Sequence, residues 1–183
     1  MNAFRKILIS TTVMLAVGAG AALANPMVGG SAMYPAKNII QNALNSKDHT
    51  TLVAAVKAAG LVDTLMSPGP FTVLAPTNEA FAALPAGTVD TLLKPENKAT
   101  LVKILTCHVI SGKVMAGAIK QMAKDDGGVH DVKTVGGCIL KLSSKNGMVD
   151  ITDEKGGMAR VTIADVRQSN GVIHVIDHVL LPN

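Results

Sequence analysis

The sequence predicts an α+β fold, with helices from its first part packed against an antiparallel-rich sheet formed mostly by its second part. Between residues 38 and 122, apolar side chains recur mainly at helical spacing, whereas from Gly127 onward they alternate or form β-branched runs. Helices followed by strands are typical of α+β domains and not of repeated βαβ units. The run Val172–Leu180 is apolar on both faces, which is typical of a strand in the middle of a sheet.

The first 24 residues have the pattern of an export signal. Arg5 and Lys6 form a basic start, Ile7–Leu23 is uncharged and mostly apolar, and Ala22-Leu23-Ala24 fits the cleavage pattern of small residues. We expect a secretory signal peptide cleaved after Ala24, and a periplasmic or extracellular protein with no integral membrane segment after cleavage. A retained membrane anchor is the alternative.

The chain after the signal is expected to hold a flexible arm and one domain. Residues 25–37 contain two prolines and two adjacent glycines, which predicts an arm, and 38–183 suits a single domain with one core. The formal net charge of +4 includes Arg5 and Lys6, so the chain after the signal carries only +2. With aromatic residues at 2%, this charge predicts no nucleic-acid partner.

Helical patterns have recognisable start and stop residues. Thr77 is a candidate N-cap, Thr50 or Thr51 is expected to cap an earlier helix, and Gly60 is a plausible residue just past its end. The helices are expected at residues 38–46, 50–59, 61–66, 77–85, 88–93, 95–105 and 116–122.

Strand patterns begin with Phe71–Ala75, which we expect to pair with the C-terminal strand. The turn Asn170-Gly171 precedes that last strand, and both residues tolerate a positive φ, so we expect a turn that uses it. Short extended pieces are expected at 108–110 and 114–115. The other strands are expected at Val129–Thr134, Cys138–Ser143, Met148–Thr152 and Ala159–Ala164, with hairpin signals at Asn146-Gly147 and Gly156-Gly157.

Three ordered segments resemble a known family. "APTNEAFAALP" after the first strand (residues 75–85) and "NGVIHVIDHVLLP" (170–182) closely resemble the two signature segments of fasciclin (FAS1) domains. "LTCHVISGKV" (105–114) resembles the Tyr-His segment of that family. The resemblance covers roughly residues 38–182 and implies one copy of the FAS1 fold, a twisted β-wedge with the N-terminal and middle helices packed against its sheet.

The resemblance also implies an adhesion or interaction role without catalysis. His108, Val109 and Ile110 match the Tyr-His segment, which in animal members is linked to integrin-dependent adhesion. Cys107 stands where the family has the Tyr, which favours a structural role for this segment and a partner surface at exposed edges near residues 108–113. We expect a monomer whose partner is a protein or a cell-surface or matrix component.

The two cysteines, Cys107 and Cys138, are expected to form a disulfide. Cysteine pairs in exported proteins usually bond, and this one would close a loop that stabilises the fold by about 3–4 kcal/mol. Two buried free thiols are one alternative. A metal pair is another, disfavoured because no second Cys or His lies at ligand spacing from either residue.

No motif for catalysis, metal or cofactor is found. The sequence has no GxSxG, P-loop, HExxH or GxGxxG pattern, and Asp125-Asp126 and Asp153-Glu154 fit solvated turns better than a catalytic pair. Ser169, His174 and Asp177 alternate faces of one turn and strand and are not expected to converge as a triad. The histidines are expected to be structural, and His108 to be buried and hydrogen-bonded.

A second function remains open from the composition. Apolar residues make up 48% of the chain and include many adaptable Met, Val and Leu side chains. These suit a binder of a lipophilic small molecule, and some fasciclin-like proteins bind carotenoids. The favoured function is the interaction module, and the alternative is a periplasmic or extracellular binder of a carotenoid- or lipid-like ligand.

Overall fold

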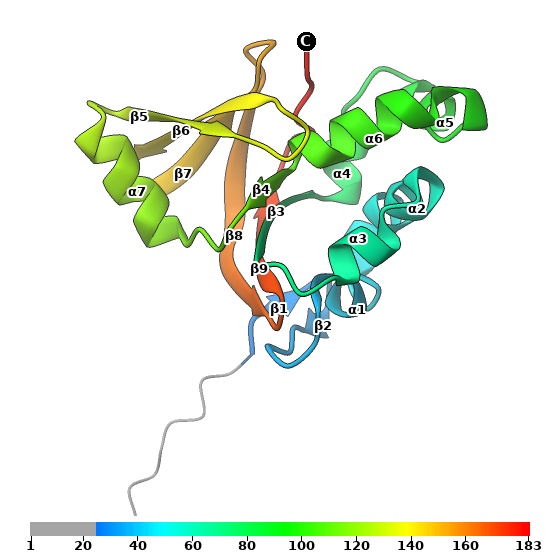
Figure 1. Ribbon diagram of the computed structural model, residues 1–183, viewed down its shortest axis with the longest axis horizontal. Coiled ribbons are helices and arrows are strands. Elements are labelled where there is room, and N and C mark those ends of the chain that lie inside the picture. Colours follow the sequence, from blue (N-terminus) through cyan, green and yellow to red (C-terminus); the bar gives the residue numbers. More distant parts are fainter. Residues whose placement is uncertain (1–24) are drawn as a thin grey trace, which may run out of the picture.

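A computed structural model describes residues 25–183, so the predicted signal peptide lies outside the described residues (Figure 1). Its main feature is a seven-stranded sheet in which only β3 and β9 are parallel and all other neighbours are antiparallel. This confirms the predicted α+β class. In spatial order the strands are β4 (Val109–Ser111), β3 (Phe71–Pro76), β9 (Gly171–Ile176), β8 (Met158–Gln168), β7 (Met148–Thr152), β6 (Ile139–Lys145) and β5 (Val129–Lys133).

The C-terminal strand β9 lies inside the sheet, as predicted. It pairs with β3 from Phe71↔Gly171 to Pro76↔Ile176 on one side and with β8 on the other, and all six of its residues are buried. The strand ends at Ile176, earlier than the apolar run suggested. Its neighbour β3 was also predicted correctly, within one residue.

The helices lie on two sides of this sheet (Figure 1). Helices α1–α6 gather beside β3 and β9, whereas α7 lies against the β5–β7 end. The core is accordingly divided between two apolar clusters, one under each set of helices. The helices are α1 (Ile39–Ala43), α2 (Thr50–Ala59), α3 (Val62–Met66), α4 (Asn78–Ala82), α5 (Thr88–Leu92), α6 (Lys98–Cys107) and α7 (Ala116–Asp125), with 3₁₀ turns η1 (Lys47–His49) and η2 (Pro95–Asn97).

The signature segment after β3 caps two helices. The Thr77 hydroxyl accepts from the Ala80 N–H at 3.3 Å, which confirms the predicted cap of α4. The next residue, Asn78, accepts from the Thr51 N–H at 3.0 Å. The expectation that Thr50 or Thr51 caps α2 is therefore wrong, because the helix receives its cap from a side chain far along the chain.

Residues 25–37 are folded and not the flexible arm that their composition suggested. They form a small hairpin of β1 (Met27–Val28) and β2 (Ser31–Ala32), and Val28 and Met33 are buried in the core. Between the strands, Gly29 has φ of 57°, and a Cβ there would lie 2.4 Å from Ser46 Oγ. Gly29 is therefore part of a tight turn packed against the start of η1, and not of a flexible arm.

The second half contains one irregularity that the sequence did not reveal. The four predicted strands are present, but β8 is much longer than expected and its register with β9 shifts twice. Asp165 lies at the second shift with φ of 60°, an unusual value for a residue other than glycine. Residues 114–115 form no strand, and α7 extends beyond Met122.

Candidate functional site

His108 lies in the core at the end of α6. Its Nδ1 donates to the Ile104 carbonyl at 2.8 Å, and its Nε2 accepts from the Leu180 N–H at 3.0 Å, which assigns the ring proton to Nδ1. Burial lowers the pKa of His108 to about 4, although the bond to Ile104 opposes that shift. The neutral ring thus ties α6 to the C-terminal segment, as expected for a structural histidine.

The three residues matched to the Tyr-His segment are all buried. Val109 belongs to one core cluster and Ile110 to the other, and the His108 ring is buried with both nitrogens bonded to the backbone. We expected this segment to contribute to an exposed partner surface. The structure corrects that expectation for these side chains, because a partner cannot reach them in the folded protein.

The sheet curls so that its two edges approach each other beside this segment. After β5, the loop 134–138 crosses the edge strand β4, and the Val135 N–H donates to the Val109 carbonyl at 2.8 Å. The expected disulfide between Cys107 and Cys138 is present next to that bond, with Cα atoms 5.5 Å apart. The disulfide therefore joins the helical layer to the closing edge of the sheet.

His174 occupies the centre of a second polar cluster. It is 0% exposed, its Nδ1 accepts from the Asp165 N–H at 3.2 Å, and its Nε2 donates to the Val114 carbonyl at 2.8 Å. The Asp165 carboxylate accepts from the Ala116 N–H at 2.7 Å, at the start of α7. Burial lowers the pKa of His174. The irregular stretch of β8 thus positions α7.

Asn170 ties three segments together before β9. Its side-chain oxygen accepts from the Ile39 N–H at 3.0 Å, and its side-chain nitrogen donates to the carbonyls of Leu65 and Ser67, both at 2.8 Å. The side chain is buried. These bonds give the predicted turn a structural role that also fixes α1 and α3.

The reason for glycine at position 171 differs from the one that we expected. Neither Asn170 nor Gly171 has a positive φ. A Cβ on Gly171 would instead lie 2.0 Å from the Phe71 carbonyl oxygen. Glycine is required here because β3 and β9 approach too closely for a side chain.

Two of the side chains considered for catalysis, His174 and Asp153, are bonded to the backbone. Both ring nitrogens of His174 are bonded to the backbone, so neither is available to Ser169 or Asp177. Asp153 accepts from three backbone N–H groups, those of Lys155, Gly157 and Leu181. Within residues 25–183, no group of three or more His, Cys, Asp or Glu side chains is placed to hold a metal ion.

An apolar cavity between α1–α3 and β3 is small. Its volume is about 50 Å³, and its walls include Val56, Leu65 and Val73 together with the buried His49. Pockets that hold small-molecule ligands usually measure roughly 300–1,000 Å³. The cavity does not support the alternative of a carotenoid- or lipid-like ligand.

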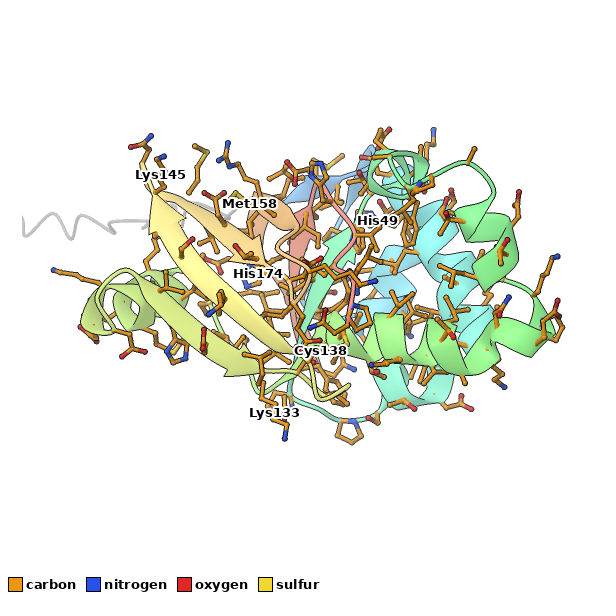
Figure 2. All side chains as sticks on the ribbon, turned by 90° about the horizontal axis from the view of Figure 1, so that it is seen from above. His49, Lys133, Cys138, Lys145, Met158 and His174 are labelled. Carbon is orange, nitrogen blue, oxygen red and sulfur yellow. A yellow bond between two sulfur atoms is a disulfide. The ribbon has the colours of Figure 1, made fainter. Side chains whose placement is uncertain are left out.

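Large apolar side chains are exposed on two parts of the chain. One group lies on the N-terminal hairpin and on α1 and α3, and the other on β5–β8 and the β5–β6 loop. Figure 2 shows Met158 with Lys133 and Lys145 on the strands of the second group. The two groups are Met27, Tyr34, Leu44 and Met66, and Val129, Val135, Ile139, Met148 and Met158.

The fold and its polar clusters define an α+β domain built around a curled sheet. Residues 47–182 match the model of the Fasciclin domain family, and the chain belongs to this family. The expected resemblance is thereby confirmed. The hairpin and α1 precede the matched residues, although they complete the core.

Relatives of the chain occur in bacteria and animals. It is 49% identical to Protein sll1483 of Synechocystis sp., over 85% of this chain and 79% of that protein. It is 41% identical to transforming growth factor-beta-induced protein ig-h3 of Sus scrofa, over 72% of this chain but only 17% of that protein. Immunogenic protein MPB70 of Mycobacterium bovis is 34% identical, over 76% of this chain and 66% of that protein.

A solved structure supports the fold. The FAS1 domain pair of the insect cell adhesion molecule fasciclin I matches with a TM-score of 0.71 at 17% identity. The match covers 79% of this chain and 51% of that chain. At this identity the likeness establishes the fold alone, which is the predicted FAS1 fold.

Proposed function

We propose that this protein is an exported, non-catalytic interaction module that mediates adhesion to a cell, matrix or surface partner. The observation that carries the proposal is the use of its buried polar side chains. His108, His174, Asp153 and Asn170 all bond to the backbone and hold segments together. A core in which the polar side chains are used in this way supports a rigid scaffold. Contacts of the protein with a partner are then made by residues on its surface.

Export is part of the proposal. The basic start, the apolar run and the small-residue pattern before Asn25 support a cleaved signal peptide. Among the described residues, no helix is long and apolar enough to cross a membrane. The buried disulfide suits an oxidising compartment, in the periplasm or outside the cell.

Attachment assays test this function. A strain that lacks the protein should adhere less to cells, matrix or a solid surface than wild type, and expression of the intact chain should restore adhesion. As a matched control, the deletion strain is made to express the chain without residues 1–24, so that the protein is not exported. Adhesion should not be restored in this control strain. Unchanged attachment of the deletion strain to all three kinds of surface would contradict the proposal.

A further inference from the structure

Strand β5 forms one edge of the large sheet and leaves alternate backbone groups free. It pairs with β6 from Val129↔Ser143 to Lys133↔Ile139. Just beyond, the Thr134 N–H donates to the Cys138 carbonyl at 2.9 Å. Because bonded and non-bonded pairs alternate along an antiparallel ladder, the N–H and C=O groups of residues 129, 131 and 133 point away from β6. Within residues 25–183, no backbone hydrogen bond from another strand or loop reaches these outward groups.

The two edges of the sheet differ in how they are covered. Edge strand β4 is crossed by the loop 134–138, whose Val135 N–H donates to the Val109 carbonyl and whose Gly136 N–H donates to the Thr106 carbonyl at 3.0 Å. On the other edge, Lys133 of β5 points outward at the margin of the molecule in Figure 2. The Asp131 side chain on the same strand is 58% exposed. An uncovered edge of this kind can pair with a further strand.

The exposed side chains of β5 carry opposite charges two residues apart. Val129, Asp131 and Lys133 are exposed along the strand, and they alternate with the half-buried His130 and Val132. Asp131 lies 3.4 Å from Lys141 of β6, whereas Lys133 forms no ion pair among the described residues. Charges on an edge usually keep other strands away. Here their signs and spacing allow the edge to pair with a second copy of itself.

Charge selects one register for such a pairing. If two copies are related by a twofold axis at Val132, Asp131 of each copy lies opposite Lys133 of the other, and the outward backbone groups of both residues can exchange hydrogen bonds. An axis at Asp131 would instead place two carboxylates opposite each other. An axis at His130 would place Asp131 opposite Val129. Opposite charges directly across two strands stabilise their pairing and like charges destabilise it, so the first register is favoured.

We propose that two copies of this chain associate through their β5 strands, antiparallel, about a twofold axis at Val132. Two symmetric pairs of Asp131 and Lys133 then form on the exposed face. On the inner face, Val132, which packs against the core cluster under α7, meets Val132 of the second copy. The contact is small, so the dimer is weak and reversible. The inference does not depend on the proposed function, and it differs from the expectation of a monomer.

Sedimentation of the exported, purified protein tests the pairing. Between about 10 μM and about 1 mM, the average mass should rise toward that of a dimer, and added salt should weaken association. Lys133→Glu and Asp131→Lys should each weaken it roughly tenfold, since both charge pairs become repulsive. An equal mixture of these two variants should associate again, because each supplies the charges that the other lacks. Lys94→Glu makes the same charge change at an exposed position outside β5 and should associate as wild type does.

The charge exchange also controls for misfolding. A variant that failed to fold would not associate in the mixture, whereas a folded variant with a reversed charge would. In ¹⁵N-labelled wild type, dilution should shift the amide signals of residues 129–133. A monomer throughout this concentration range would overturn the proposal. So would association that Lys133→Glu leaves unchanged, a mixture that stays monomeric although both variants melt as wild type does, or concentration-dependent shifts confined to other surfaces.

Discussion

Mild acid should destabilise the folded protein through His108. Its Nε2 accepts from the Leu180 N–H, and a protonated ring would place a second donor against that donor. The pKa of His108 is about 4 when folded, against an ordinary value of 6.5. Because the unfolded chain binds the proton more tightly, stability is complete above about pH 6.5 and is lost as the pH falls toward 4. The loss from this group is about 2 kcal/mol at pH 5 and about 3 kcal/mol at pH 4.

Urea unfolding measured between about pH 7.5 and pH 4.5 checks this expectation. The variant His108→Gln keeps a polar side chain but cannot titrate, so its free energy of unfolding should depend less steeply on pH than that of wild type. Burial also lowers the pKa values of His174 and His49, and both contribute to the pH dependence of wild type and variant alike. The difference between the two curves therefore isolates His108.

Two results would refute this reasoning. A ring-proton titration of folded His108 near its ordinary value, followed by NMR, would mean that the ring is not held neutral by the core. Parallel loss of stability in wild type and His108→Gln would mean that other groups carry the acid sensitivity.

Three further predictions concern packing and covalent structure. Gly171→Ala should destabilise the protein severely because the added Cβ meets a backbone oxygen of β3. The control Gly117→Ala in α7, where space is open, should stabilise the protein by about 0.5–1 kcal/mol. Thermal melting compares the two variants, and equal changes in melting temperature would contradict the close approach of β3 and β9. Asn170→Ala should lower the urea midpoint strongly because it leaves buried backbone groups without partners, each at a cost of about 1–3 kcal/mol. Reduction of the Cys107–Cys138 disulfide should cost about 3–4 kcal/mol in the chain-entropy model, and an unchanged melting temperature after reduction would show that the bond adds no stability.

Local sequence patterns predicted the elements that depend on neighbouring residues. The apolar run of β9 and the short strand β3 were recognised because β-branched residues and a bounding proline or turn are local signals. The cap of α4 by Thr77 was found for the same reason. The strands after Gly127 were likewise located by alternation and by Asn-Gly or Gly-Gly turns.

Features that depend on distant contacts were not predictable in this way. Asn78 caps α2 across 27 residues of sequence, and no local pattern indicates such a cap. The folded N-terminal hairpin depends on burial of Val28 and Met33, which lie in a segment rich in glycine and proline without a regular apolar spacing. The unusual φ of Asp165 is compensated by bonds to His174 and to the start of α7. A surface groove is lined by α6, the β7–β8 turn and the C-terminal segment, which meet only after folding.

The position of β9 has a consequence for the way in which this protein is made. A chain synthesised from its N-terminus has released every other strand of the large sheet before β9 exists, yet β9 must insert between β3 and β8. Until then, β3 and β8 each present an unpaired edge to the surroundings. The sheet therefore cannot be completed until residues 171–176 have been synthesised, and a strand pairing across about a hundred residues of sequence decides when the molecule reaches its final shape.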